Sequence, residues 1–362
     1  MEKYKEVFAR LKEQRVVIVE AQGGALSPDF FITALNGYNG QITVTEPQRA
    51  LVQSVCQNVA CQIGCQVGKH VGYQLSGYTR TSDTTRMVFR VDQSVSMFLA
   101  RRQNGLGSGL LIVDRAYDRS LQLDFLLGQI ALNLNQSPQS HIILVSPPRA
   151  ENVREGEAHL LDLLTYRFPQ APVIRLEHNS SEPSSESCEV LKGEYLWTAA
   201  VRKVKELMEE REPATVLLLL ATRQDVKKSC KALNGLRNTE VFSYHSKLDS
   251  HDQQRIWNAT PGKWRIVCST NALRGVSLPG LLYVIDAQET VRMSEDRFGV
   301  RRHLVVSVSE VDVHQAKQSL PSGGRYIGLG TDVGLRAYPE PAIKREPATG
   351  VAMQIANRPV VI

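Results

Sequence analysis

The chain has 362 residues, of which 42% are hydrophobic and 22% are charged, and its formal net charge is +6. This composition excludes a disordered or fibrous protein, and the length allows two globular domains. The longest apolar run, residues 216–221, is too short to cross a bilayer, and the N-terminus lacks the apolar stretch of a secretory signal. We therefore expect a cytoplasmic protein with no membrane partner, whose mild positive charge is compatible with nucleic acid.

In the first half of the chain, short runs of Val, Ile and Leu alternate with helical patterns. Buried strands are predicted at residues 15–22, 41–47, 109–116 and 141–148, and a helix is predicted at 48–64. This alternation predicts an α/β domain with a parallel sheet covered by helices.

Residues 178–194 interrupt this pattern, because they are rich in Ser, Glu and Pro and offer little to bury. Helix and strand patterns then resume and predict a second α/β domain. The expected organisation is a first domain at 1–178, a linker at 179–194, a second domain at 195–335 and the start of a helical region at 336–362.

Five phrases occur in one order along the chain: "VTEPQRALVQSVCQNVA" (44–60), "VGKHVGYQL" with "SDTTRMVFRVDQ" (67–93), "IVDRAYDRSLQLDFLLG" (112–128), "RIVCSTNALRGVSLPGLLYVID" (265–286) and "YPEPAIKREPATGVAMQIA" (338–356). Together they resemble the DEAH-box RNA helicases of superfamily 2, particularly the bacterial HrpA-type members. The resemblance implies two tandem RecA-like domains with parallel sheets, followed by the opening of a helical, winged-helix region. It also implies ATP with Mg²⁺ as cofactor and RNA as partner.

The nucleotide-binding positions depart from the family pattern. In "EAQGGALS" (20–27), Gly23, Gly24 and Ser27 match the family's phosphate loop, but Leu26 stands at the lysine position. That lysine would neutralise β- and γ-phosphate charge, which a leucine cannot do. Asp114 fits the aspartate that holds Mg²⁺ in the family, whereas Arg115 replaces the glutamate that polarises the attacking water.

Two further motifs are altered. The family's SAT segment is "SPP" (146–148), and the segment "VHQAKQSLPSGGRY" (313–326) aligns Gln315 but places Ala316, Ser319 and Ser322 at the three arginine positions. Such arginines stabilise transition-state charge, and arginine fingers are worth about 10³–10⁵ in rate. Because these groups act on one phosphate, we expect no catalysis, and Asp114 is the only remnant of the catalytic set.

Strand binding is the activity that the remaining residues favour. Thr45 and Arg49 in the first phrase, with Thr270 and Asn271 in the fourth, match positions that hold the RNA backbone in the family, and Arg274 offers an additional phosphate contact.

Other readings of the same residues stay open. Because the lysine is absent, Gly23 and Gly24 are more typical of a plain strand-to-helix turn than of a nucleotide loop, and Asp114 fits a helix cap as well as a metal ligand. Three functions follow: an inactive helicase-like protein that binds single-stranded RNA or a protein partner, a diverged but active ATP-dependent RNA helicase, or a protein-interaction scaffold without nucleic acid. Cys56, Cys61 and Cys65 lie close together, and we expect core packing there, since a fourth ligand for a metal is not evident.

Overall fold

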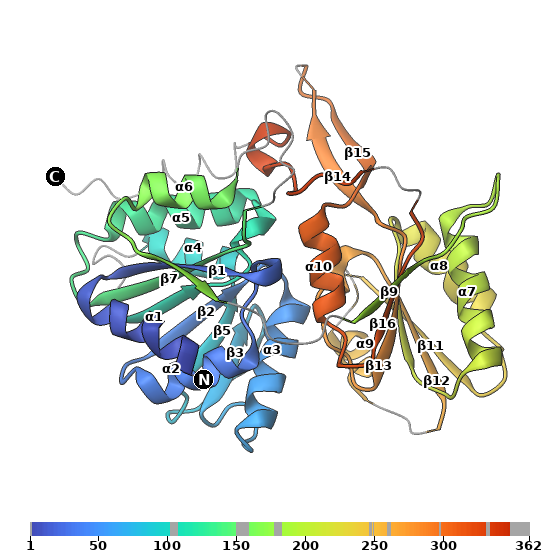
Figure 1. Cartoon of the computed structure of the whole chain (residues 1–362), viewed down its shortest axis with the longest axis horizontal. Coiled ribbons are helices and arrows are strands. Elements are labelled where there is room, and N and C mark those ends of the chain that lie inside the picture. The colour runs from blue at the N-terminus through green and yellow to red at the C-terminus, as the bar shows by residue number, and fades with distance from the viewer. Residues whose placement is uncertain are drawn as a thin grey trace. The chain divides into compact units, whose positions relative to one another are not determined.

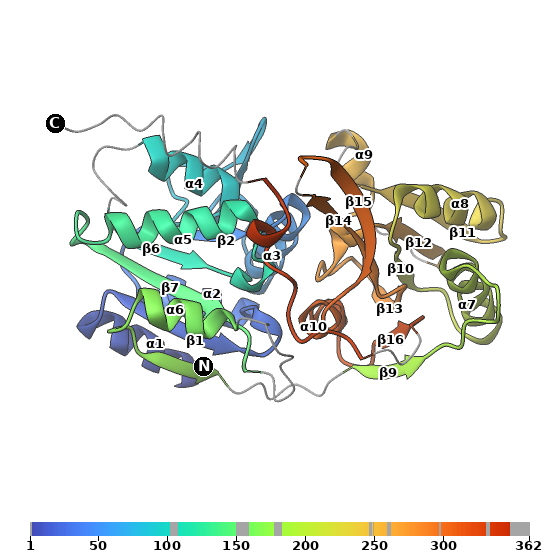
Figure 2. The ribbon, with the colours of Figure 1, turned by 90° about the horizontal axis from the view of Figure 1, so that it is seen from above.

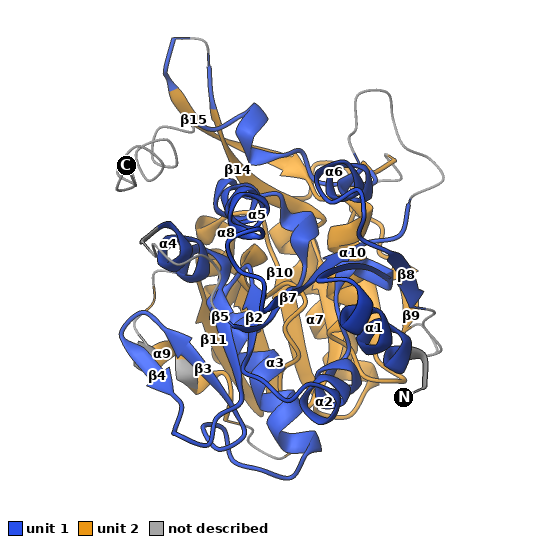
Figure 3. Ribbon diagram, turned by 90° about the vertical axis from the view of Figure 1, so that its left-hand side faces the viewer, with its two compact units in different colours: residues 1–178, 295–300, 337–362 blue, residues 179–294, 301–336 orange. Residues whose placement is uncertain are grey.

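The computed structural model describes residues 2–101, 108–149, 159–176, 183–245, 248, 250–258, 262–296, 298–330 and 334–347 (Figure 1). The chain divides into two compact units (Figure 3). Unit 1 comprises Met1–His178, Glu295–Val300 and Ala337–Ile362, and unit 2 comprises Asn179–Ser294 and Arg301–Arg336.

In the described part of unit 1, eight strands form one sheet in the order β4-β3-β5-β2-β6-β7-β1-β8. The strands are β1 (Val16–Ala21), β2 (Ile42–Glu46), β3 (Val71–Leu75), β4 (Tyr78–Arg80), β5 (Met87–Val91), β6 (Gly109–Val113), β7 (Ser140–Ser146) and β8 (Val173–Leu176). All neighbours pair in parallel except β3 and β4, which pair antiparallel. The carboxyl ends of β5, β2 and β6 therefore meet at one edge of the sheet.

Helices cover both faces of this sheet (Figure 2). They are α1 (Glu2–Glu13), α2 (Pro28–Gly37), α3 (Arg49–Gln62), α4 (Asp92–Arg101), α5 (Leu121–Asn133) and α6 (Leu160–Arg167), with short 3₁₀ turns η1 (Gln22–Gly24), η2 (Ala116–Asp118) and η4 (Ala342–Lys344). Helices α1, α2 and α3 pack on one face of the sheet and form an apolar core with it. In this core Phe30, Phe31 and Phe89 are fully buried. Cys56 lies in this core as expected, whereas Cys65 is half-buried and Cys61 is exposed, so the expected core packing is wrong for Cys61.

Unit 2 is built around a six-stranded parallel sheet in the order β11-β12-β10-β13-β16-β9. Its strands are β9 (Ser184–Ser187), β10 (Thr215–Leu219), β11 (Thr239–Tyr244), β12 (Trp264–Ser269), β13 (Leu281–Asp286) and β16 (Arg325–Gly328), and β14 (Glu289–Glu295) pairs with β15 (Arg301–Ser307) in a separate hairpin. The helices are α7 (Leu196–Glu210), α8 (Arg223–Leu233), α9 (Ser250–Arg255) and α10 (Glu310–Gln318), with the 3₁₀ turn η3 (Asn271–Leu273). Figure 1 shows α7 and α8 on one face of the sheet and α10 on the other.

The predicted strands and helices of both halves form, and the predicted α/β class with parallel sheets is confirmed. The expected linker at 179–194 is wrong in part, because residues 184–187 form β9 and pair with β16 at the edge of the second sheet. All four residues of β9 are exposed, so the strand is held by backbone hydrogen bonds to β16 and not by side-chain burial. Of the region expected at 336–362, residues 348–362 lie outside the described part, and residues 337–347 carry the short turn η4. Among the described helices, none is both long and apolar enough to cross a membrane.

Candidate functional site

The segment that aligns with the phosphate loop is a tight turn pressed against other parts of unit 1. Gly23 and Gly24 are both buried and have φ of 65° and 68°, the left-handed region that favours glycine. A Cβ on Gly24 would meet Cδ1 of Tyr117 at 2.9 Å and Cδ of Pro147 at 3.1 Å. The two rings thus cover the glycine whose backbone would otherwise approach a phosphate.

Leu26, at the lysine position, belongs to the apolar core of unit 1 and is only 6% exposed. Its backbone N–H donates to Oδ1 of Asp114 at 3.1 Å. The hydroxyl of the next residue, Ser27, lies 2.9 Å from the hydroxyl of Tyr4. The N–H and the hydroxyl that a phosphate or its metal would use therefore already have partners within unit 1.

The corner after β6 is closed by an internal ion pair. Arg115 adopts a left-handed backbone with φ of 52°, and its side chain turns inward, so that Nε lies 2.9 Å from Oε2 of Glu46. Its backbone N–H also donates to Oδ1 of Asp114 at 3.0 Å. The guanidinium occupies the corner with a fixed positive charge and cannot accept a proton from water.

Three carboxyl groups lie at the carboxyl ends of neighbouring strands: Glu46 is the last residue of β2, Asp92 directly follows β5, and Asp114 directly follows β6. All three are almost completely buried. Burial raises the pKa of Glu46 well above its usual range, although Arg115 opposes this shift, and the charge of Asp114 adds to it. Burial also raises the pKa of Asp92 to about 7 and that of Asp114 to about 6. This edge of the sheet therefore favours protonated carboxyls or an internal cation.

These residues do not fit Mg²⁺ with a nucleotide. Asp114 uses Oδ1 for two backbone N–H groups, and Arg115 already supplies positive charge beside it. Across the described residues, no group of three or more His, Cys, Asp or Glu side chains is arranged to hold a metal ion. Of the residues expected at the nucleotide, Gly24, Ser27 and Asp114 have contacts within the chain in this structure.

The segments that align with the family's SAT motif and with its arginine motif also make contacts within the chain. Ser146 donates its hydroxyl to the carbonyl of Pro147 at 3.0 Å. In α10, Gln315 and Ala316 are fully buried. Ser319 follows and donates to the carbonyl of Ala316 at 2.6 Å. None of these side chains supplies the positive charge that the family's arginines bring.

The two expected RNA-binding residues of unit 1 differ in accessibility. Thr45 is fully buried at the end of β2, next to Glu46. The expected contact between its side chain and the RNA backbone is therefore wrong in this structure. Arg49 is exposed at the start of α3, and Nη2 donates to the carbonyl of Ser76 at 3.0 Å. Arg49 therefore keeps a solvent-facing charge beside the carboxyl edge of the sheet.

In unit 2, Arg274 is buried in an ion pair instead of facing a phosphate. Its Nη1 and Nη2 donate to the two oxygens of Asp286 at 2.6 and 2.9 Å, and Nη1 also donates to the carbonyl of Asp312 at 3.2 Å. Nε donates to Oδ1 of Asn271, so Asn271 holds the arginine in place. The expected phosphate contact by Arg274 is corrected, whereas Thr270 remains half-buried at the turn after β12.

Sequence reasoning did not single out Glu46, Asp92 and Asp286. One signal was present, since each of these acidic residues stands at or directly after the end of a predicted or family-like strand. What the sequence does not show is that Glu46 and Asp286 are paired with arginines placed by other turns, Arg115 and Arg274.

The two α/β units each have a parallel sheet with altered motifs at the carboxyl ends of its strands, the arrangement expected of tandem RecA-like domains. A family profile for the helicase conserved C-terminal domain matches residues 199–297. The ATP-dependent RNA helicase HrpA of Escherichia coli (strain K12) is 25% identical over 351 residues, which cover 94% of this chain and 26% of HrpA. HrpB of the same organism is 26% identical over 285 residues, covering 77% of this chain and 34% of HrpB.

The solved structure of Escherichia coli DEAH/RHA helicase HrpB matches with a TM-score of 0.73 at 22% identity, covering 97% of this chain and 45% of that chain. The chain is thus related to the DEAH-box RNA helicases and shares their tandem RecA-like fold, which confirms the resemblance of its motifs. It spans about a quarter to a third of the length of HrpA and HrpB.

Proposed function

We propose that this chain is a DEAH-type helicase-like protein that does not hydrolyse ATP. We propose that it binds single-stranded RNA weakly, through contacts with the sugar–phosphate backbone of the RNA. The observation that carries this proposal is the closed phosphate turn: the N–H of Leu26 donates to Asp114, and Arg115 pairs with Glu46. A nucleotide would have to displace both interactions from a buried edge of the sheet.

Loss of turnover follows from the chemistry of the replaced groups. Hydrolysis needs positive charge on the γ-phosphate, a group that activates water, and arginines that stabilise the transition state. Leu26 supplies no charge, Arg115 accepts no proton, and Ala316, Ser319 and Ser322 offer no cation. Catalytic groups that act on one transition state are not additive, and the loss of one removes most of the benefit of the others. Since the phosphate charge, the water-activating group and the arginines are all missing, we expect no residual hydrolysis.

RNA binding is supported by the relatives, which are named as RNA helicases, and by the exposed Arg49 on a chain of net charge +6. Phosphate contacts by basic side chains are independent of base sequence. The expected affinity is therefore low, salt-sensitive and nearly the same for different sequences.

A second candidate, a protein-interaction scaffold without nucleic acid, is favoured by the burial of Thr45 and by the internal ion pair of Arg274. These two residues reduce the set of side chains that could hold a strand. The diverged active helicase is the third candidate, and it requires the closed phosphate turn to open when nucleotide binds.

The deciding experiment measures nucleotide and RNA binding on the same protein. Calorimetric titration with ATP, with and without Mg²⁺, should show no metal-dependent binding. An ATP hydrolysis assay with added RNA should show no turnover above background. Labelled single-stranded RNA should bind with an affinity that falls as salt rises, with a log–log slope of about −0.7 for each phosphate contact.

Substitution of Arg49 separates RNA binding from the scaffold. Arg49→Ala should make the salt slope shallower by about 0.7, the value for one contact on a single strand. The matched control is Arg10→Ala, which removes an exposed arginine on α1 that pairs with Glu13. RNA binding that is absent in the parent supports the scaffold, and RNA binding that is unchanged in Arg49→Ala contradicts the assigned role of Arg49. Mg²⁺-dependent ATP turnover supports the active helicase.

A further inference from the structure

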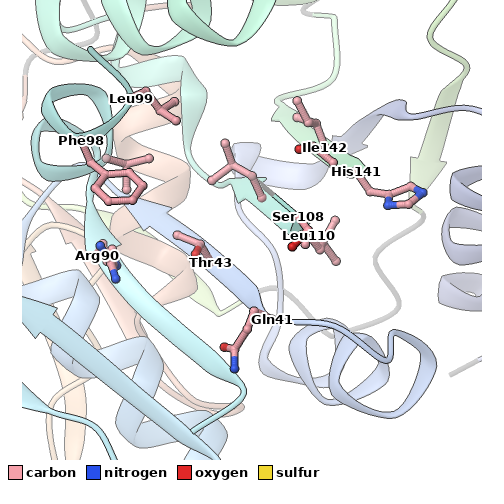
Figure 4. A pocket seen from close by; sticks show the side chains of 13 residues that line it. Gln41, Thr43, Arg90, Phe98, Leu99, Ser108, Leu110, His141 and Ile142 are labelled. Atoms are coloured by element: carbon pink, nitrogen blue, oxygen red, sulfur yellow. The ribbon is translucent and has the colours of Figure 1, made fainter. Parts of the chain in front are cut away.

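Unit 1 contains a cavity of about 170 Å³ between its sheet and helix α4 (Figure 4). Its lining gathers around the amino-terminal ends of β2, β6 and β7, where Gln41, Gly109 and Ser140 lie, and includes Arg90 from β5. Arg90 lies nearer the carboxyl edge of the sheet, opposite Thr45 on β2, but the lining includes no residue of the phosphate turn and none of the three buried carboxyls. The cavity is therefore separate from the candidate nucleotide site.

Arg90 brings an uncompensated positive charge to this cavity. Its Nε is buried without a hydrogen-bond partner, and within the described part of the chain its guanidinium forms no ion pair. Its neighbour is the ring of Phe98, whose centroid lies 6.0 Å from Cζ of Arg90. Burial lowers the pKa of Arg90, yet an arginine stays charged at any ordinary pH.

A partly buried cation without a counter-charge is costly, and this cost is relieved when an anion binds. The planar guanidinium fork matches carboxylate and phosphate oxygens in particular. Figure 4 shows Arg90 and Thr43 on neighbouring strands, with Phe98 and Leu99 on the helix across from them. A ligand placed here would meet the charge on one side and apolar side chains on the other.

The rest of the lining indicates what kind of anion fits. The hydroxyls of Thr43, Ser108 and Ser140 can donate hydrogen bonds, whereas Val95 and Leu99 form an apolar wall. A water molecule takes up about 30 Å³ in the liquid, so the cavity has room for a small organic molecule but not for a nucleotide. Pockets of this composition bind ligands that have one polar head and an apolar body.

We propose that this cavity binds a small organic anion, a carboxylate or a phosphate monoester, whose head pairs with Arg90 and whose body packs against Phe98, Val95 and Leu99. The site is separate from the proposed RNA binding, because Arg49 is not among the residues that line the cavity. A result that contradicts RNA binding would therefore leave the proposed anion site untouched, and the reverse is also true.

Binding of simple probes tests the site. Benzoate and phenyl phosphate should bind saturably in a calorimetric or NMR titration of the whole chain, and uncharged benzamide should bind at least about tenfold more weakly, a difference of about 1.4 kcal/mol. A preference between the two anions distinguishes a carboxylate site from a phosphate site. Equal binding of benzoate and benzamide, or no saturation by either anion up to about 10 mM, would overturn the proposal.

Substitutions locate the binding. Arg90→Gln should abolish the preference for the anion over benzamide, and Phe98→Ala should weaken both anions while keeping that preference. The matched control is Arg80→Gln, because Arg80 also lies over an aromatic ring, 5.4 Å from the centroid of Tyr78, but outside the cavity. Thermal unfolding checks that each variant is folded, and a folded Arg90→Gln that still prefers benzoate contradicts the assigned role of Arg90.

Discussion

Nε of Arg115 lies 2.9 Å from Oε2 of Glu46, and both side chains are almost completely buried. The arginine stands where the related helicases place the glutamate that activates water, and the pair joins the corner after β6 to the end of β2. A position that serves chemistry in the family has become an internal ion pair of unit 1. Three predictions concern this pair and its neighbours, and a fourth concerns the ion pair of Arg274 in unit 2.

Removing one partner of the pair should destabilise unit 1 strongly. Arg115→Met leaves Glu46 buried without a counter-charge, and breaking such a pair costs about 3–5 kcal/mol. Replacing both partners, as Arg115→Met with Glu46→Leu, should restore most of the stability because neither member of the pair is then left buried without the other. Urea unfolding of the single and double variants measures the coupling. Additive losses in the double variant would show that the two groups act independently.

The buried carboxyls should make unit 1 less stable as pH rises. The pKa of Asp92 is about 7 in the folded chain, above its ordinary value of 3.8, so the folded state favours the protonated form. Its contribution to stability is fully present below the ordinary pKa and is lost as pH rises through about 7, by on the order of 4 kcal/mol. Asp92→Asn should therefore flatten the pH dependence and stabilise the chain at pH 8.

The control for this pH series is Asp83→Asn, which replaces an exposed carboxyl in a turn. Thermal unfolding between about pH 4 and pH 8 compares the two variants with the parent. A parent chain whose stability rises over this range, or an Asp92→Asn variant that follows the parent, would contradict the assignment.

Restoring the two obvious catalytic residues should not restore ATP hydrolysis. In Leu26→Lys with Arg115→Glu, the lysine replaces a core leucine, and the glutamate leaves Glu46 with a like charge beside it. Tyr117 and Pro147 would still cover Gly24, and the positions of Ala316, Ser319 and Ser322 would still lack a cation. The expected result is a less stable chain with background turnover. Robust RNA-dependent hydrolysis would mean that another cation, such as Arg325, acts in place of the missing arginines.

Arg274 should prove to be a residue of the fold of unit 2. Arg274→Ala leaves Asp286 buried and unpaired by any cation in the described part of the chain, and should cost about 3–5 kcal/mol. Tyr326→Phe removes the hydroxyl that donates to Asp286 at 3.0 Å and should cost about 1.5–3 kcal/mol, the range for hydrogen bonds to charged groups.

Hydrogen exchange of the β12 and β13 amides measures both losses locally, and Arg223→Ala, at the exposed start of α8, is the control. RNA binding by the folded fraction of Arg274→Ala should equal that of the parent. A stable variant with weakened RNA binding would return Arg274 to the role predicted from the sequence.

The amino-acid sequence by itself determined the two α/β units and showed the resemblance to the DEAH-box helicases. Runs such as residues 110–113 and 216–221 are apolar throughout, which is the pattern of strands buried on both faces of a parallel sheet. Such patterns depend on the chain's own hydrophobic periodicity and survive the loss of catalytic residues. The sequence also showed which family positions had changed, because Leu26 and Arg115 stand inside otherwise matching phrases.

Only the tertiary structure decided what the changed residues do. Arg115 and Glu46 are 69 positions apart, and Arg274 and Asp312 are 38 apart, so their contacts arise from strand order and turn geometry. The same holds for Thr45, which matches an RNA contact in the family but is buried here, and for Arg90, whose missing counter-charge appears only when the lining of its cavity is known. A side chain's type sets which partners it can accept, whereas its burial and its neighbours, which come from distant segments, set which partner it has.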